Sequence, residues 1–124
     1  MVMKNTIILI LEKSLKMTPN DTDLRITKNL MSAYLLANRL DEAVELGELS
    51  LPRKNSMVYT LLAYAEAIIG DRERARRYIY DQLDFANPVN QGNFYQQMAA
   101  INEKEFLDKI FTKLTDLGLP KLNW

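Results

Sequence analysis

LRITKNLMSAYLLANRLDEAVELGELSL, residues 24–51, decides the fold of this chain. Apolar residues recur in it at three- and four-residue spacing on both sides of Asn38, which predicts two amphipathic helices joined by a short turn. Each helix keeps a second apolar stripe once the two have paired, so we expect this hairpin to stack on neighbouring helices. The first stripe is Leu24, Leu30, Ala33, Tyr34 and Ala37, and the second is Leu40, Ala43, Leu46 and either Leu49 or Ser50.

The apolar pattern of this hairpin returns twice more, each time after 32 residues. The turn positions keep the same step at Asn38, Gly70 and Asn102, and Asn and Gly are the residue types that adopt a left-handed backbone most easily. We therefore expect an all-α fold, a superhelical stack of antiparallel helix pairs at 23–51, 56–86 and 90–117. The matching apolar positions are Leu30, Leu62 and Phe94; Ala33 and Ala65; Ala43, Ala75 and Leu107; Leu46, Tyr78 and Ile110; and Leu51 and Leu83.

Two segments flank the repeated pairs, and with them residues 1–124 make one predicted domain. A leading helix is expected at 2–17, with Ile7, Ile8, Leu11 and Leu15 on one stripe and Pro19 ending it. The branched run TIILIL at 6–11 also fits a strand, but no second convincing strand exists to pair with it. Gly118 is expected to stop the last helix, which leaves 119–124 as an apolar tail over the last pair.

Composition narrows the class of function. Sixteen basic residues balance sixteen acidic ones, so no net field favours nucleic acid or an acidic membrane surface as partner. The chain has no cysteine and no histidine, and its four glycines stand singly, which leaves nucleophilic, metal-dependent and phosphate-loop chemistry without its usual residues. The apolar run at 7–11 is too short for a signal peptide or a membrane span. We expect a soluble cytoplasmic binding protein, not an enzyme, with no metal or cofactor and no membrane insertion.

A helix-turn-helix unit of this length and pattern resembles the tetratricopeptide repeat. Leu30, Tyr34 and Ala43 stand where that family has its Leu, its Tyr and its second-helix Ala, and NRLDEAVEL looks like the family's turn and second-helix start. The leading helix resembles the second half of a repeat whose first half is missing. In the second unit the matching residues are Tyr59, Leu62, Gly70 and Ala75.

The chain departs from the family's pattern at several places. Glu66 replaces the tyrosine of the second unit, and Met98 and Leu107 stand at the Tyr and Ala places of the third. Gly47 lies where a large side chain usually packs. The resemblance therefore implies a degenerate last repeat and, because the motif is shared by very many proteins, only a general role in peptide binding.

A narrower resemblance links the chain to the small tetratricopeptide-like chaperones of bacterial type III secretion, which hold the needle subunit before export. The similar runs are LDEA ending near Pro52, then MVYTLLAYAEAIIG at 57–70 and FANPVNQGNFYQQMAA at 85–100. This similarity implies a cytoplasmic chaperone that buries the amphipathic C-terminal helix of a needle subunit, usually together with a second, small helical co-chaperone. The alternative is a general tetratricopeptide scaffold or adaptor.

In stacked helix pairs the first helices line the concave face, so their residues pointing away from the core are candidates for contact with a guest helix. Each candidate has an alternative place in the core, because apolar residues at helical spacing are common there. The candidate groove residues are Lys28, Ser32, Leu35 and Leu36 of the first pair, Met57, Thr60, Tyr64, Ala67 and Ile68 of the second, and Gln96, Ala99 and Ala100 of the third.

Two charged runs are weaker candidates for a binding site. The arginines of GDRERARRYIYD, residues 70–81, together with Tyr78 and Tyr80 could form an anion patch, but Asp71 and Glu73 interrupt them and favour the solvated face of an outer helix. The acidic residues of DEAVELGE, residues 41–48, are likewise expected to face solvent. A clamp for a C-terminal carboxylate is disfavoured because Lys28 has no partner at the matching position, Thr60.

Overall fold

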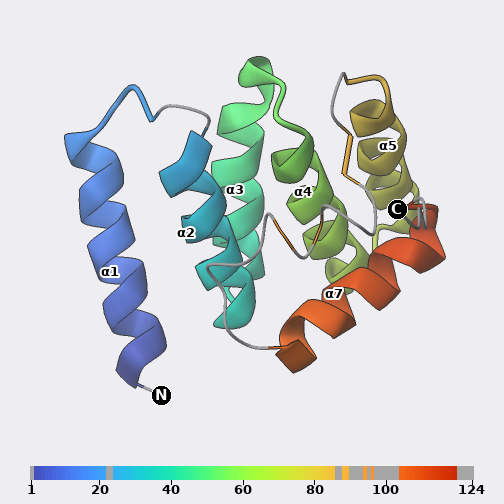
Figure 1. Ribbon diagram of the computed structural model, residues 1–124. Coiled ribbons are helices and arrows are strands. Elements are labelled where there is room, and N and C mark those ends of the chain that lie inside the picture. Colours follow the sequence, from blue (N-terminus) through green and yellow to red (C-terminus); the bar gives the residue numbers. More distant parts are fainter. Residues whose placement is uncertain are drawn as a thin grey trace.

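The computed structural model describes residues 2–21, 24–85, 88–89, 94, 96 and 104–119, and these contain helices and no strand (Figure 1). The predicted all-α class is confirmed. The strand alternative for 6–11 is wrong, because one helix runs through that segment. The elements are α1 (Val2–Met17), α2 (Arg25–Leu36), α3 (Leu40–Ser50), the 3-10 turn η2 (Leu51–Arg53), α4 (Ser56–Ile69), α5 (Arg72–Leu83) and α7 (Lys104–Leu117).

Two helix pairs form where the repeat predicts them. α2 packs against α3, α4 packs against α5, and α3 packs against α4, so the two pairs stack side by side with α1 on the outer side of α2 (Figure 1). α7, the second helix of the predicted third pair, runs obliquely across α4 and α5 (Figure 1). Most of the predicted first helix of that pair, and residues 120–124 of the predicted tail, lie outside the described residues, although Phe94 and Gln96 are helical.

The turns inside both pairs have the predicted left-handed residue. Asn38 has φ 61° and Gly70 has φ 117°, and Asn102 lies outside the described residues. After α2, the N–H of Arg39 donates to the carbonyl of Tyr34, and after α4 the N–H of Asp71 donates to that of Glu66. These backbone bonds use carbonyls that the helix end leaves without a partner, so each helix stops at a fixed place and the next one turns back against it.

Side chains fix where the helices begin. The carboxylate of Asp21 accepts hydrogen bonds from the backbone N–H groups of Ile26 and Thr27 at the start of α2. Asn55 does the same for Met57 and Val58 at the start of α4. Since the first N–H groups of a helix have no partner within it, these acceptors stabilise both helix starts.

The core follows the 32-residue repeat. Leu30, Leu62 and Phe94 are buried at the first repeated position, and Ala43, Ala75 and Leu107 at the second. Of the two alternatives at the end of α3, Ser50 is buried at 7% exposure while Leu49 is 75% exposed. The predicted stripe of α1 is wrong at Ile7, which is exposed, whereas Ile8 is fully buried against α2. Leu119, the first residue of the predicted tail, is buried.

Gly47 lies where α2, α3 and α4 meet, and the structure explains why no larger residue stands there. A Cβ at this position would lie 2.6 Å from Leu62 Cδ2 and 2.7 Å from Met31 Cε. Met31 and Leu62 are both fully buried, so they already occupy the space that a side chain at position 47 fills in the usual repeat.

Replacing Gly47 with alanine should destabilise the protein although alanine favours a helix. Overpacking costs about 1–3 kcal/mol and the gain in helix propensity is roughly 1 kcal/mol, so we expect a net loss of about 1 kcal/mol in the free energy of unfolding. Urea denaturation measures it. Leu62→Ala should cost less in the Gly47→Ala background than in the wild type, and the exposed control Glu45→Ala should change stability by under about 0.5 kcal/mol. Equal costs of Leu62→Ala in both backgrounds would contradict this contact.

Candidate partner-binding surface

Six of the ten predicted groove residues that the structure describes are buried within the chain itself. Met57 and Thr60 are 1% and 0% exposed, and neither side chain is open to a partner in this structure. The prediction that these residues line an open groove is therefore wrong. They lie in the core, which was the alternative for each of them. The buried members of the predicted set are Ser32, Leu35, Met57, Thr60, Tyr64 and Ala67.

The buried hydroxyl groups of this set bond within their own helices. Ser32 Oγ donates to the carbonyl of Lys28 at 2.9 Å, and Thr60 Oγ1 donates to the carbonyl of Ser56 at 2.8 Å. Such a bond to the residue four positions earlier satisfies a hydroxyl group without any second molecule. Ser32 and Thr60 therefore fit the inner face of a packed pair.

The remaining predicted residues are half-buried, exposed or outside the described residues. Lys28 and Leu36 on α2 are half-buried, and Ile68 and Gln96 are exposed. Ala99 and Ala100 lie outside the described residues. Within the predicted set, the structure brings only Tyr64 and Ile68 together at one described hollow.

This hollow lies between α4 and the outward face of α7 and has a volume of about 410 Å³. Tyr64 and Ile68, one turn apart on α4, form its apolar part. The ring of Tyr64 meets that of Phe106 edge to face at 6.4 Å, and burial raises the pKa of the Tyr64 hydroxyl. The α7 residues that line the hollow are Glu105, Asp108, Lys109, Thr112, Lys113 and Asp116.

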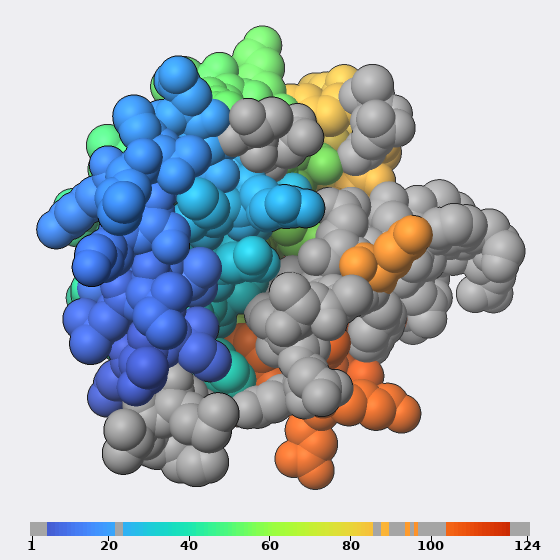
Figure 2. All heavy atoms as spheres, turned by 60° about the vertical axis from the view of Figure 1, so that its left-hand side comes forward, coloured from blue at the N-terminus to red at the C-terminus, as the bar shows by residue number. Residues whose placement is uncertain are grey.

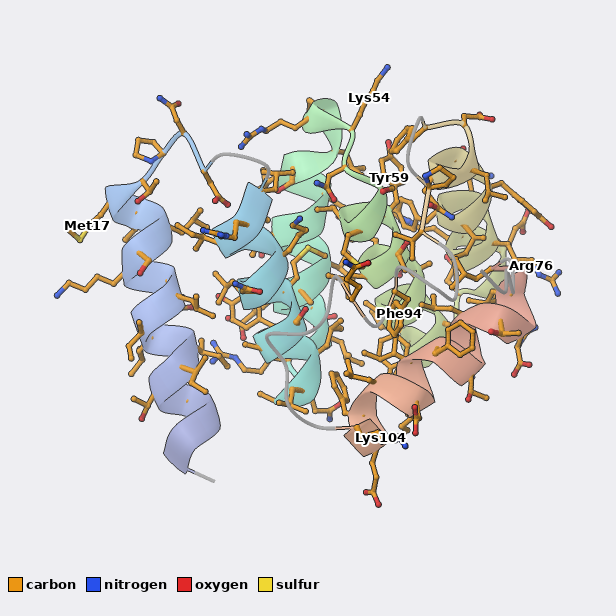
Figure 3. The ribbon with its side chains drawn as sticks, in the orientation of Figure 1. Met17, Lys54, Tyr59, Arg76, Phe94 and Lys104 are labelled. Carbon is orange, nitrogen blue, oxygen red and sulfur yellow. The ribbon has the colours of Figure 1, made fainter. Side chains whose placement is uncertain are left out.

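Four of the eight large apolar residues that are exposed in the described part of the chain lie on α1, and the sequence did not predict them as a surface. Ile7, Leu9, Ile10 and Met17 are between 47% and 74% exposed. Ile7, Ile10 and Met17 follow one another at spacings of three and seven residues, so they lie on one face of the helix. Figure 2 shows α1 (blue) as one edge of the molecule, with α2 set back beside it, and Met17 projects away from the chain in Figure 3. We call Ile7, Leu9, Ile10 and Met17 the α1 stripe.

A polar contact fixes α1 to the rest of the stack. Tyr34 Oη donates to Glu12 Oε2 at 2.6 Å, and burial together with this contact raises the pKa of the Tyr34 hydroxyl. The guanidinium of Arg39 lies 4.9 Å from the centre of the Tyr34 ring and pairs with Glu42. The buried side of α1 is thus held in place by an apolar and a polar contact, while the α1 stripe faces away from α2.

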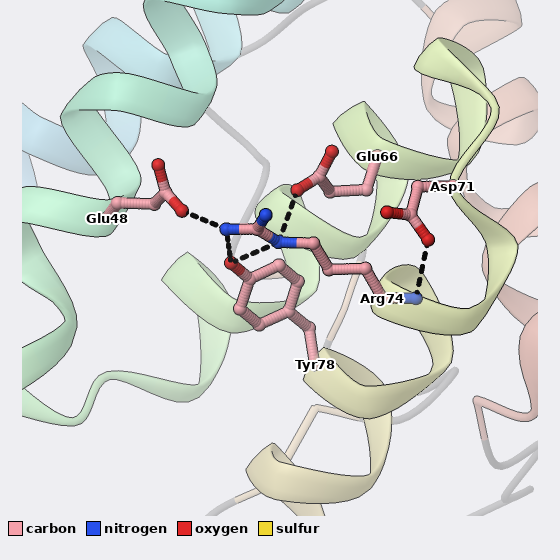
Figure 4. A network of polar contacts seen from close by, with 5 residues as sticks. All are labelled: Glu48, Glu66, Asp71, Arg74 and Tyr78. Carbon is pink, nitrogen blue, oxygen red and sulfur yellow. Dashed lines mark hydrogen bonds and ion pairs between the residues drawn. The ribbon is translucent and has the colours of Figure 1, made fainter.

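A second polar network joins α3, α4 and α5 (Figure 4). Arg74 Nε lies 2.8 Å from Glu66 Oε2, and Arg74 Nη2 pairs with Glu48. Arg74 also contacts the hydroxyl of Tyr78, while Asp71 accepts a hydrogen bond from the Arg74 backbone and caps α5. Arg74 and Glu48 are 47% and 38% exposed, in agreement with the expected solvated faces, and they also connect neighbouring helices.

The rest of the arginine run behaves as a solvated face. Arg72, Arg76 and Arg77 are exposed on α5, and Arg76 points outward in Figure 3. Acidic Asp71 and Glu73 lie among them and line the same shallow hollow as Arg77. This arrangement of both signs agrees with the predicted outer helix face and gives no concentrated anion site.

No group of acidic residues suited to hold a metal ion, and no helix long and apolar enough to cross a membrane, occurs in the part of the chain that the structure describes. Comparisons with protein-family models, with curated proteins and with solved structures found no match for this chain. Two apolar surfaces, the α1 stripe and the hollow at Tyr64 and Ile68, are the candidate sites for a protein partner.

A charge placed at Met57 should unfold the chain, because this side chain is buried in the core. Met57→Glu should lower the free energy of unfolding by several kcal/mol, the scale for burying an unpaired charged group. Ile68→Glu, on the same helix but 39% exposed, is the matched control and should change it little. Thermal melts followed by circular dichroism measure both. A Met57→Glu protein with an unchanged melt would restore this position to an open groove.

Glu66 should make stability depend on pH in a defined direction. Its side chain is only 7% exposed, and burial raises its pKa although Arg74 opposes the shift. A raised carboxyl pKa means that the folded state binds the proton more readily than the unfolded state, so this contribution is present at low pH and lost as pH rises through the folded pKa.

Glu66→Gln tests this sign. The variant should be at least as stable as the wild type at neutral pH, because glutamine is neutral and of similar shape. The wild type should gain stability relative to the variant as pH falls towards 4.5, the ordinary pKa of this group. Urea denaturation of both proteins at several pH values measures the difference. A wild type that loses stability relative to Glu66→Gln on acidification would show that the ion pair with Arg74 dominates.

Proposed function

We propose that this chain is a tetratricopeptide-like chaperone that binds amphipathic helices of partner proteins, holding a type III secretion needle subunit soluble in the bacterial cytoplasm. The observation that carries the proposal is the α1 stripe, whose four large apolar residues a soluble chain rarely exposes together without a partner. The stacked helix pairs and their 32-residue repeat support it as well.

The α1 stripe is a helix face against which a partner helix can pack. Among the described helices α1 packs mainly against α2, whereas α3 packs against both α2 and α4. A helix of a small co-chaperone would pack there and complete the stack, as the resemblance implies. Lys13 and Lys16 are exposed on α1, so a partner helix with acidic residues beside its apolar stripe would match it.

The proposal assigns no reaction and no cofactor to the chain. Histidine and cysteine are missing from the sequence, and the strongest described polar cluster, around Arg74, has its groups bonded to one another. A general scaffold that associates with itself through α1 is the alternative, and light scattering of the isolated chain with and without its partners separates the two proposals. A chaperone should form a complex of fixed stoichiometry at the expense of self-association.

Co-expression with a candidate needle subunit and co-chaperone should yield a soluble complex of defined mass, measured by size exclusion with light scattering. Ile7→Glu with Ile10→Glu should weaken co-chaperone capture at least about tenfold, because charges replace the centre of the α1 stripe. Both positions are exposed, so the melting temperature should change little. Tyr80→Glu, which replaces an exposed apolar residue on α5 instead of on α1, is the control and should bind as the wild type does. A needle subunit that polymerises regardless of the chain would refute the proposal.

A further inference from the structure

α7 covers the part of α4 where the sequence places a guest helix. Tyr64 belongs to the predicted groove, and its ring is covered by Phe106 of α7 at 6.4 Å with the two ring planes at 87°. Ile68, one turn further along α4, lies at the edge of the same contact and is exposed. α7 runs obliquely over α4 and α5 (Figure 1), in the position of a helix laid on the face of the stack.

α7 is an amphipathic helix whose apolar face is buried. Its opposite face is charged and lines the hollow beside Tyr64 with acidic and basic residues. Its end is defined locally, since the Gly118 and Leu119 N–H groups donate to the carbonyls of Thr115 and Leu114, and Gly118 has φ 114°. The helix therefore needs no neighbour to set where it stops. Its apolar face consists of Phe106, Leu107, Ile110, Phe111, Leu114 and Leu117.

We infer that the surface of α4 and α5 beneath α7 is a binding surface for a partner's amphipathic helix, and that α7 occupies it until such a helix replaces it. This inference rests on the proposed function and adds the place of binding and the kind of guest. The guest carries large apolar residues at the spacing of the α7 face, that is at relative positions 0, 1, 4, 5, 8 and 11.

The exchange is feasible because a guest helix replaces the apolar contacts that are lost when α7 is released. Releasing α7 alone would expose five buried apolar side chains, those of Leu107, Ile110, Phe111, Leu114 and Leu117. The Phe111 ring also lies 5.9 Å from that of Phe94, so a guest with the same pattern covers Phe94 together with the same residues of α4 and α5, and the two states differ mainly in which helix is bound. α7 is attached to the chain, so it competes with a guest at an effective concentration in the millimolar range. The apparent affinity for a guest is therefore reduced in proportion to the fraction of chains in which α7 is released.

A cross-link across the hollow tests this exchange on the full chain. Ile68 and Thr112 are exposed on opposite sides of it, and the chain has no native cysteine, so Ile68→Cys with Thr112→Cys accepts a short bifunctional thiol reagent selectively. The probe is a fluorescent peptide of residues 104–119 of the chain itself, and fluorescence anisotropy measures its binding. The control peptide carries Ile110→Ser and Leu114→Ser.

The probe should bind the unlinked chain, and the cross-link should weaken its binding at least about tenfold. The control peptide should bind neither form. Binding that the cross-link leaves unchanged, or no binding of the probe at millimolar concentration, would overturn the inference. Either result can be read without the needle subunit, so failure of the exchange and failure of the proposed function are distinguishable.

A second variant separates a displaceable helix from a merely structural one. Phe106 is half-buried, and Phe106→Ala removes its ring contact with Tyr64, so the probe should bind up to about tenfold more tightly. Lys109→Ala, on the exposed face of α7, is the matched control and should leave probe affinity unchanged. A Phe106→Ala chain that is less stable but binds the probe no better would overturn the inference.

Discussion

The contact of Leu62 and Met31 over Gly47 is the one on which the stack depends. It is the point at which the first helix of each pair and the second helix of the first pair come together, and the missing side chain at position 47 allows it. A larger residue there would force Leu62 and Met31 to shift and would weaken the core that the two pairs share. The usual repeat fills this space from the second helix, whereas this chain fills it from the two first helices. The same close approach of α3 to α4 brings Glu48 within reach of Arg74.

Polar contacts then hold the order of the helices that apolar packing permits. Arg74 connects Glu48 of α3 with Glu66 of α4, and it is carried by α5, so three helices of two pairs meet at one guanidinium. Glu66 stands where the tetratricopeptide pattern has a tyrosine, and burial of its carboxylate is tolerated because Arg74 lies beside it. Tyr34 plays the corresponding part for α1 through Glu12. Apolar contact is not directional, so such bonds favour one register of the helices over its neighbours.

The two ends of the stack are finished differently, and this difference bears on function. At one end α1 leaves four large apolar side chains exposed. At the other, α7 turns its apolar face onto α4 and α5 and presents charges outward. A repeat protein needs a polar outer face at its ends to stay soluble, and α7 meets this need while α1 does not. The proposed co-chaperone site and the proposed exchange site therefore lie at opposite ends of the stack, one on an exposed apolar face and the other on a face that α7 covers.

The sequence by itself determined the described helices, the pairing of α2 with α3 and of α4 with α5, and much of the core. The 32-residue repeat places Asn38 and Gly70 at left-handed turns and Leu30, Leu62 and Phe94 inside, because local backbone preference and apolar periodicity act over a few residues and are visible in the chain. The candidate surface was only partly predictable. Periodicity shows that Met57, Thr60 and Tyr64 share a face of α4, but whether that face is open or covered depends on contacts between residues far apart in the chain. Only the tertiary structure decided that α7 lies over Tyr64 and that Ile7 and Ile10 face outward, because nothing in the local sequence fixes which neighbour a second apolar stripe meets.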